Sequence, residues 1–352
     1  MRVSSKTMKS QKILLAIKKP LIAIKKRATT YSKYNPHRSF KRTLPRDDSR
    51  SLKLPRYFAF SVYVWRTLWT HRKIFILLAL VYALLTALMV GIASQDTYIT
   101  LKETLNATGG DFLAGAWGEF GKAGLLFVTA LTGGLSQSLS DVQQVYTVLI
   151  TLLTWLTSVW LLRNILAGHK VKLKDGLYSA GSPILATFLV ALLLLVQLLP
   201  VALALIGYVA AAASGLLTGG VEAMLFWFAA GLLIALSLYW ITSTFFALVI
   251  VTLPGMYPMQ AIRTAGELVI GRRLRILLRL LWMAAGILIT WGLIMIPMIL
   301  FDTWLKNIWP AIDWVPIIPI LLLAISAFTI VWASSYIYLL YRKVVADDAS
   351  SD

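Results

Sequence analysis

The chain contains no cysteine, and this absence removes several kinds of chemistry at once. Without thiols it can form no disulfide, hold no metal through thiolate ligands and use no cysteine nucleophile. Histidine is almost as scarce, because His37, His71 and His169 are the only three and they lie far apart. Catalysis and metal binding need acids, bases or ligands at matched positions, and these histidines show no metal-ligand spacing. We therefore expect a protein that is not an enzyme and that holds no metal or cofactor.

Charged residues are also few. They make up 14% of the 352 residues, whereas hydrophobic residues make up 59%. A typical soluble protein has about 25% charged residues and about half apolar ones. The apolar residues are gathered in long blocks rather than spread in stripes, which is typical of membrane-spanning helices.

Six such blocks are present, at about residues 74–95, 145–167, 183–213, 223–253, 274–301 and 315–341. Each exceeds the ~20 residues that a helix needs to cross ~30 Å of hydrocarbon. The sequence therefore predicts an all-α fold, a polytopic membrane helical bundle with six transmembrane helices plus amphipathic interfacial helices. The third block is longer than a straight span requires, and we expect a kink at Pro200.

The basic residues are unevenly distributed. Four segments that would lie on one side of a six-span protein hold 31 of the 34 Lys and Arg, and the opposite segments hold three. These four segments are residues 1–73, 164–182, 254–273 and 342–352, taken with Arg163, Arg275 and Arg279 at the adjoining helix ends. Because cytoplasmic loops are enriched in Lys and Arg, we expect a multi-pass protein of the plasma or inner membrane with both termini in the cytoplasm. The net charge of +19 is explained in this way, so nucleic acid is not expected as a partner.

The domain organisation follows from these patterns. Residues 1–55 are expected to be a largely disordered, basic cytoplasmic tail that fixes the topology, or alternatively a segment that lies on anionic lipid. Its apolar runs are too short for a signal peptide. Residues 56–345 would form the transmembrane domain, and residues 346–352 a short acidic tail.

Three further segments do not fit a pattern of spans and loops. Aromatic and basic residues crowd together between Tyr57 and Lys73, which predicts a helix in the headgroup layer that leads into the first span. The Gly-rich segment 96–144 predicts an amphipathic helix on the outer surface, with a re-entrant plug as the alternative. In the third segment, 254–273, prolines end the fourth span, and Pro258 is placed to open an amphipathic helix that ends in cations.

This third segment carries two short motifs, Ala-Ile-Arg-Thr at 261–264 and Leu-Val-Ile-Gly-Arg at 268–272. In these motifs, and in a fourth span that ends near a proline, the chain resembles a superfamily of bacterial and archaeal membrane proteins. Its members are the YciC-like proteins and the membrane domains attached to some glycerophosphoryl diester phosphodiesterases. The resemblance implies a six-helix bundle. It implies no hydrolase activity, because the chain has no phosphodiesterase catalytic domain, and the basic tail is not part of the shared pattern.

No ionisable residue lies near the middle of a predicted span, whereas ion-coupled transporters usually place one there. Gln197 is the only amide well inside a span. We expect it to hydrogen-bond to a neighbouring helix, with a place in the lining of a cavity as the alternative.

These observations favour a non-enzymatic integral membrane protein that supports envelope or lipid homeostasis or acts as a scaffold. Its cationic cytoplasmic face would contact anionic lipid headgroups, a protein partner or a second copy of the chain. The cations expected to make these contacts are Arg66, Arg72, Lys73, Arg263, Arg272, Arg273 and Arg275. The alternative is a permease or export component for an apolar or amphipathic solute, which would need no charge in the spans.

Overall fold

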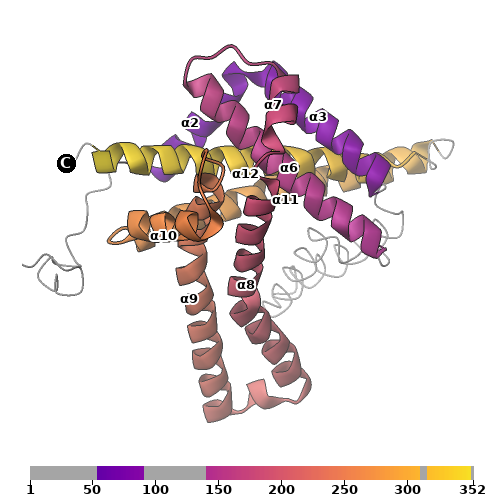
Figure 1. Cartoon of the computed structure of the whole chain (residues 1–352). Coiled ribbons are helices and arrows are strands. Elements are labelled where there is room, and N and C mark those ends of the chain that lie inside the picture. Colours follow the sequence, from indigo (N-terminus) through magenta and orange to yellow (C-terminus); the bar gives the residue numbers. More distant parts are fainter. Residues whose placement is uncertain (1–53, 91–139, 310–314, 350–352) are drawn as a thin grey trace, which may run out of the picture. The chain divides into compact units, whose positions relative to one another are not determined.

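A computed structural model of the chain describes residues 54–90, 140–309 and 315–349. The expected basic tail, up to residue 53, and the Gly-rich segment, up to residue 139, lie outside these ranges. Within them the chain is helical and contains no strand, which confirms the all-α prediction. The elements are α2 (Tyr57–Thr70), α3 (Arg72–Met89), α6 (Asp141–Leu166), α7 (Leu173–Ala180), α8 (Ile184–Ala213), the short 3-10 helix η1 (Leu216–Thr218), α9 (Gly220–Ile250), α10 (Pro258–Val269), α11 (Arg273–Ile308) and α12 (Ile317–Ala349) (Figure 1).

Six of these helices are long and apolar enough to cross a membrane, namely α3, α6, α8, α9, α11 and α12. They correspond one to one to the six predicted blocks. The last two continue well past the predicted ends, to Ile308 and Ala349. An apolar block ends where the hydrocarbon would end, whereas a helix ends where its backbone hydrogen bonds stop, so polar turns can extend a span.

The packed core lies where α2, α3, α6, α9 and α12 meet. On α2, Phe60, Val64 and Leu68 are buried at intervals of four residues, so they share the face of the helix that packs on α12. The ring of Phe60 meets the ring of Tyr336 edge-on, with the centroids 4.9 Å apart. The helix predicted before the first span is therefore present, and an aromatic contact between Phe60 and Tyr336 joins it to the core.

The α8 and α9 helices form a hairpin joined through η1. The Thr244 hydroxyl donates a hydrogen bond to Gln197 Oε1, and the Ser237 hydroxyl donates to the Gln197 carbonyl, both at 2.6 Å. The expectation that Gln197 bonds to a neighbouring helix is confirmed. Pro200 lies three residues further along α8 and has no N–H to donate to a carbonyl of the preceding turn. Ser and Thr hydroxyls on a neighbouring helix can donate to backbone carbonyls of such a helix, which makes a proline inside it less costly.

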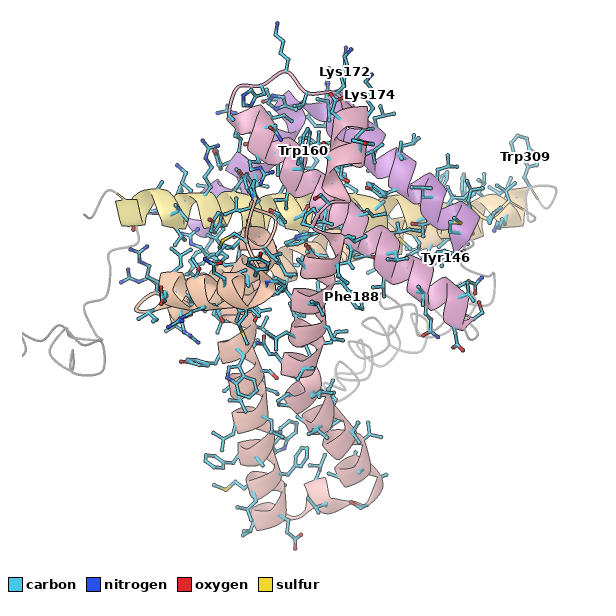
Figure 2. The ribbon with its side chains drawn as sticks, in the orientation of Figure 1. Tyr146, Trp160, Lys172, Lys174, Phe188 and Trp309 are labelled. Carbon is cyan, nitrogen blue, oxygen red and sulfur yellow. The ribbon has the colours of Figure 1, made fainter. Side chains whose placement is uncertain are left out.

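Many large apolar side chains on this hairpin are exposed, including Phe188 (Figure 2). A soluble monomer rarely exposes a continuous apolar surface of this extent, whereas lipid-facing helices require one. Figure 1 shows the hairpin running across the direction of α11 and α12. The six candidate spans are therefore identified by the length and composition of each helix and not by a shared direction.

The sequence did not predict α7, an eight-residue helix that packs on α6. Its close approach depends on the buried Gly176. A Cβ atom at this position would lie 3.0 Å from Leu161 Cδ2 and 3.3 Å from Thr157 Cγ2. Leu161 and Thr157 are themselves fully buried, so they have little room to move.

We expect Gly176→Val to lower the free energy of unfolding by about 1–3 kcal/mol, because the added atoms overpack the α6–α7 contact. Gly181→Val is the matched control, since a Cβ atom at Gly181 meets nothing within 4 Å and its backbone φ is −68°. The midpoint of thermal unfolding in mild detergent measures both variants. Equal midpoints would contradict the close packing of α7 on α6.

Candidate functional site

Segments that lie far apart in the sequence meet at one end of the described helices. Arg163 Nη1, in the last turn of α6, donates a hydrogen bond to the Thr252 carbonyl just after α9 (3.0 Å). Arg272 Nη1, just before α11, donates to the Val344 carbonyl in α12 (3.4 Å). Between these ends, α7 packs on α6, and α10 packs on α9 and α8. We call this region the basic end: the final turns of α6, α9 and α12, the first turns of α2, α3, α8 and α11, and the helices α7 and α10.

Arg279 on α11 fastens α2 to this end. Its Nη2 atom donates to the Pro55 carbonyl (2.6 Å), and its guanidinium carbon lies 5.0 Å from the centroid of the Tyr57 ring and 5.6 Å from that of Phe60. The Tyr336 hydroxyl on α12 donates to the Arg279 carbonyl (3.3 Å). One buried arginine therefore joins three helices through carbonyl and ring contacts.

The structure corrects the prediction for Arg272. This residue was expected at the surface, but its side chain is 1% exposed. Its Nη1 atom lies 3.7 Å from Asp347 Oδ2, in the last turns of α12. Gly271 turns the chain at a φ of +78°, which directs the next residue inward. Arg272 therefore connects α11 to α12 and does not present its guanidinium to a lipid or partner.

Arg273 occupies an intermediate position. It is half-buried, its Nη1 atom donates to the Tyr239 carbonyl (3.2 Å), and its guanidinium carbon lies 4.0 Å from the centroid of the Tyr239 ring. A cation that stacks at this distance on an aromatic face is held in place. The five remaining expected cations are exposed: Arg66, Arg72, Lys73, Arg263 and Arg275.

These exposed cations fall into two groups. Arg66, Arg72 and Lys73 belong to α2 and α3, which pack on α12 and α6, whereas Arg263 and Arg275 belong to α10 and α11. Arg263 lies 4.0 Å from Glu267 on the same exposed face of α10, a contact too long and too solvated to neutralise it. The sequence predicted a cationic cytoplasmic face, and the structure places its exposed cations in two sets on separate helices.

Exposed aromatic side chains accompany the first group. Trp65 and Trp69 stack with their centroids 5.7 Å apart, and both are exposed. The guanidinium carbon of Arg72 lies 5.4 Å from the centroid of the Trp69 ring. Exposed indoles beside cations are typical of the membrane–water interface, where an amphipathic ring contacts both apolar and polar surroundings.

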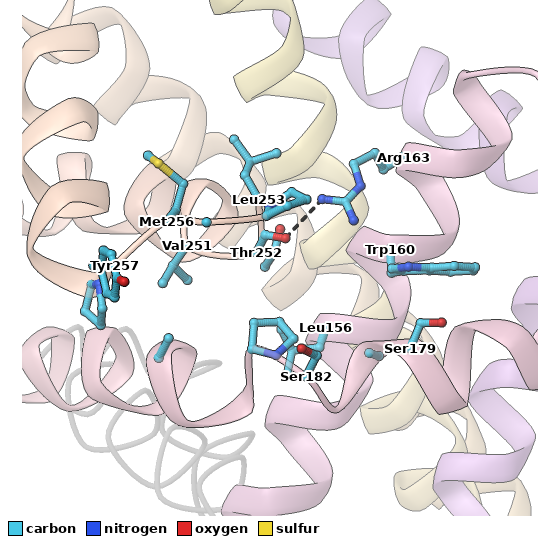
Figure 3. Close-up of a pocket in the computed structure, with 16 residues that line it drawn as sticks. Leu156, Trp160, Arg163, Ser179, Ser182, Val251, Thr252, Leu253, Met256 and Tyr257 are labelled. Atoms are coloured by element: carbon cyan, nitrogen blue, oxygen red, sulfur yellow. Dashed lines mark hydrogen bonds between the residues drawn. The ribbon is translucent and has the colours of Figure 1, made fainter.

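A pocket of about 450 Å³ opens at the basic end between α6, the turn from α7 to α8, and the loop from α9 to α10 (Figure 3). Arg163 and Trp160 lie on its α6 side and Tyr257 lies across from them, while Ser179 and Ser182 come from the segment that leads into α8. All of these residues belong to the ends of helices or to the connections between them. The pocket is therefore a feature of one end of the spans and not a passage along them.

Local backbone chemistry forms this pocket. After α9 ends, Gly255 adopts a φ of +77° that other residues rarely tolerate, and the chain turns back to Pro258, the first residue of α10. Pro183 occupies the N-cap position of α8 on the opposite side of the pocket. Neither the α8 nor the α10 N-terminus has a side-chain cap, so their first N–H groups are not bonded by a capping side chain.

Within the ranges 54–90, 140–309 and 315–349, no group of three or more His, Asp or Glu residues is arranged to hold a metal ion. His71 Nδ1 lies 3.2 Å from the Thr67 carbonyl of its own helix, and His169 is exposed. Neither histidine belongs to such a group in these ranges.

Sequence reasoning did not find the pocket or the Arg163–Thr252 hydrogen bond. Arg163 was counted only as a basic residue at the end of a span. The available signal was the turn at residues 254–255 opposite an arginine that ends another span, but a contact across 89 residues cannot be read from spacing alone.

Comparisons with protein-family models, with curated proteins and with solved structures found no match for this chain. The six candidate spans define its class, which is that of integral, multi-pass membrane proteins.

We expect Arg272→Met to lower stability by about 3 kcal/mol, because it removes the cation that faces the nearly buried Asp347 carboxylate and leaves the Val344 carbonyl without this donor. Arg263→Met is the control, since Arg263 is 78% exposed and its loss should cost less than about 1 kcal/mol. Thermal unfolding in mild detergent compares the two variants. A midpoint for Arg272→Met as high as that of the control would show that the buried arginine does not hold α11 to α12.

Proposed function

We propose that this protein is a non-enzymatic membrane component that supports envelope or lipid homeostasis, or acts as a scaffold, and that its basic end faces the cytoplasm. The exposed cations of this end would bind anionic lipid headgroups. A protein partner or a second copy of the chain could approach the same cations. The family resemblance seen around α10 agrees with a non-hydrolytic role of this kind and remains part of the proposal.

The observation that carries the proposal is the combination of exposed cations and exposed indoles on α2. The helix buries Phe60, Val64 and Leu68 against the core, while its other face presents Trp65, Trp69 and Arg66. A helix with apolar rings and cations on its outward face partitions into the headgroup layer. Each Lys or Arg near an anionic surface contributes roughly 1 kcal/mol, so several of them together would give a clear preference for anionic lipid.

The orientation can be tested because the chain has no cysteine of its own. Lys170, after α6, and Ser214, after α8, are both exposed and lie at opposite ends of the spans. In intact cells a membrane-impermeant maleimide should label Ser214→Cys, and it should label Lys170→Cys only after permeabilisation. The reverse pattern would place the basic end outside and overturn the proposed orientation.

The lipid preference is tested with a variant in which Arg66, Arg72, Lys73 and Arg263 are all replaced by glutamine. We expect the enrichment of phosphatidylglycerol over phosphatidylcholine around the reconstituted protein to fall at least fivefold, because four headgroup cations are lost. Native mass spectrometry of the protein released from mixed nanodiscs measures this ratio.

The matched control keeps the charge by exchanging Arg for Lys, and Lys for Arg, at the same four positions. It should retain the enrichment of the unmodified protein. If the glutamine variant retains it equally, the exposed cations do not select anionic lipid.

A further inference from the structure

The pocket at the basic end differs in character from the exposed cations around it. Its volume of about 450 Å³ lies within the range of small-molecule sites, roughly 300–1,000 Å³. It is built from three segments of the chain, which α10 and α7 hold in place by packing on their neighbours. A cation on an open helix face meets many lipids in turn, whereas a pocket can hold a single ligand.

The pocket lining carries positive charge and no negative charge. Among its sixteen lining residues Arg163 is the only Lys or Arg, and none is Asp or Glu. Arg163 Nη1 donates to the Thr252 carbonyl, as the dashed line in Figure 3 marks. A carbonyl orients the guanidinium without neutralising it, and a guanidinium carries five N–H donors in a fixed fork. One such bond leaves further donors for an oxyanion.

The surrounding groups favour the same kind of ligand. Ser179, Ser182 and Tyr257 line the pocket and offer hydroxyl donors. The N-terminal residues of α8 and α10 also line it, so the positive ends of two helix dipoles add to the field of the arginine. The hydroxyls and the dipoles strengthen a site that the cavity and its single uncompensated cation already define.

The remaining lining is apolar. Leu156 and Trp160 on α6, with Val251 and Met256 near the end of α9, form this part of the wall. Leu156 and Trp160 lie in the last turns of one candidate span, and Val251 and Met256 follow the end of another, where the headgroup layer of a membrane would be. A ligand that fits both parts has an anionic head and an apolar remainder.

We propose that this pocket binds the headgroup of one phospholipid, with the phosphate at the Arg163 guanidinium and the glycerol and first methylenes against Trp160 and Leu156. The proposal deepens the proposed function and rests on it. It adds a site for a single lipid, which is separate from the lipids that the exposed cations attract.

The test titrates the purified protein in mild detergent with dioctanoyl phosphatidylglycerol and follows binding by native mass spectrometry. We expect one site, and Arg163→Gln should weaken it about tenfold or more, because a charge-assisted phosphate contact is lost. Arg163→Lys should recover part of the affinity, since it restores the charge without the fork. Arg263→Gln, on the exposed face of α10, should leave this single site unchanged.

A second variant guards against misfolding, because Arg163 also holds the Thr252 carbonyl. Ser182→Phe fills the pocket from an exposed position and leaves Arg163 in place. It should remove the single site without lowering the midpoint of thermal unfolding. Retention of the site in both Ser182→Phe and Arg163→Gln would overturn the proposal.

Two further probes identify the ligand. Dioctanoyl phosphatidylcholine should bind more weakly than phosphatidylglycerol, because its choline cation opposes the arginine. Glycerol 3-phosphate should bind at least tenfold more weakly, because it makes no contact with the apolar wall. If glycerol 3-phosphate binds as tightly as the lipid, the pocket serves a soluble phosphate ester and the lipid proposal fails.

The result also separates the pocket from the surface. If the pocket proposal alone is wrong, Arg163→Gln leaves the single-site titration unchanged, while the variant lacking four exposed cations still loses its enrichment in anionic lipid. If the proposed function alone is wrong, that enrichment persists without the four cations, while the single-site titration still responds to Arg163.

Discussion

Arginine side chains that donate to backbone carbonyls hold the basic end together. Arg163, Arg272, Arg273 and Arg279 each reach the carbonyl of a segment far away in the sequence. A buried or half-buried guanidinium must be hydrogen-bonded, since leaving it unpaired away from water is costly. Arg272 also lies 3.7 Å from the Asp347 carboxylate. A carbonyl satisfies the donor without cancelling the charge, so the helices are joined while the end of the molecule stays cationic.

This arrangement divides the cations into two kinds. Arg272 and Arg279 are buried and connect helices, and their charge acts only as part of the general field. Arg66, Lys73 and Arg263 are exposed at the surface of their helices. The sequence shows all of them as basic residues in or beside the segments that connect the apolar blocks, although their roles differ. Only burial separates them, and burial depends on which helix packs against each one.

The sequence predicted the fold well because hydrocarbon imposes a simple requirement. Every backbone N–H and C=O group in a span must be satisfied internally, so an apolar block of sufficient length has to be a helix. That argument located α3, α6, α8, α9, α11 and α12. It could not locate α7, which has eight residues of mixed composition and is held by the contact of Gly176 with Leu161. It assigned Gln197 a partner on a neighbouring helix but could not identify Thr244, because hydropathy carries no information about register between helices.

The site was predicted less well, and the misses share one physical cause. Arg272 was expected to be exposed because the cations around it are, but the positive φ of Gly271 turns it toward α12. Arg163 was noted only for its charge, and its hydrogen bond to the Thr252 carbonyl, 89 residues further along the chain, could not be read from the spacing. In both cases the carbonyl that the arginine reaches lies far away in the sequence, 89 residues for Arg163 and 72 residues for Arg272. A pattern of residue types records the glycine but not the direction of the turn.

The same geometry explains why arginine suits the pocket better than lysine. The Arg163 guanidinium donates to the Thr252 carbonyl through one nitrogen, and the same side chain lines the pocket, so its fixed fork has further N–H donors for a ligand. A lysine ammonium is a compact point charge on a flexible stem, so the bond that fixes it to a carbonyl does not set the direction of its remaining donors. Arg272 connects two helices, and Arg263 presents its charge at the surface. The planar guanidinium of Arg163 does both, since it bonds the segment after α9 and also lines the pocket. Helix packing and the proposed anion binding at this end of the protein would therefore depend on the same side chain.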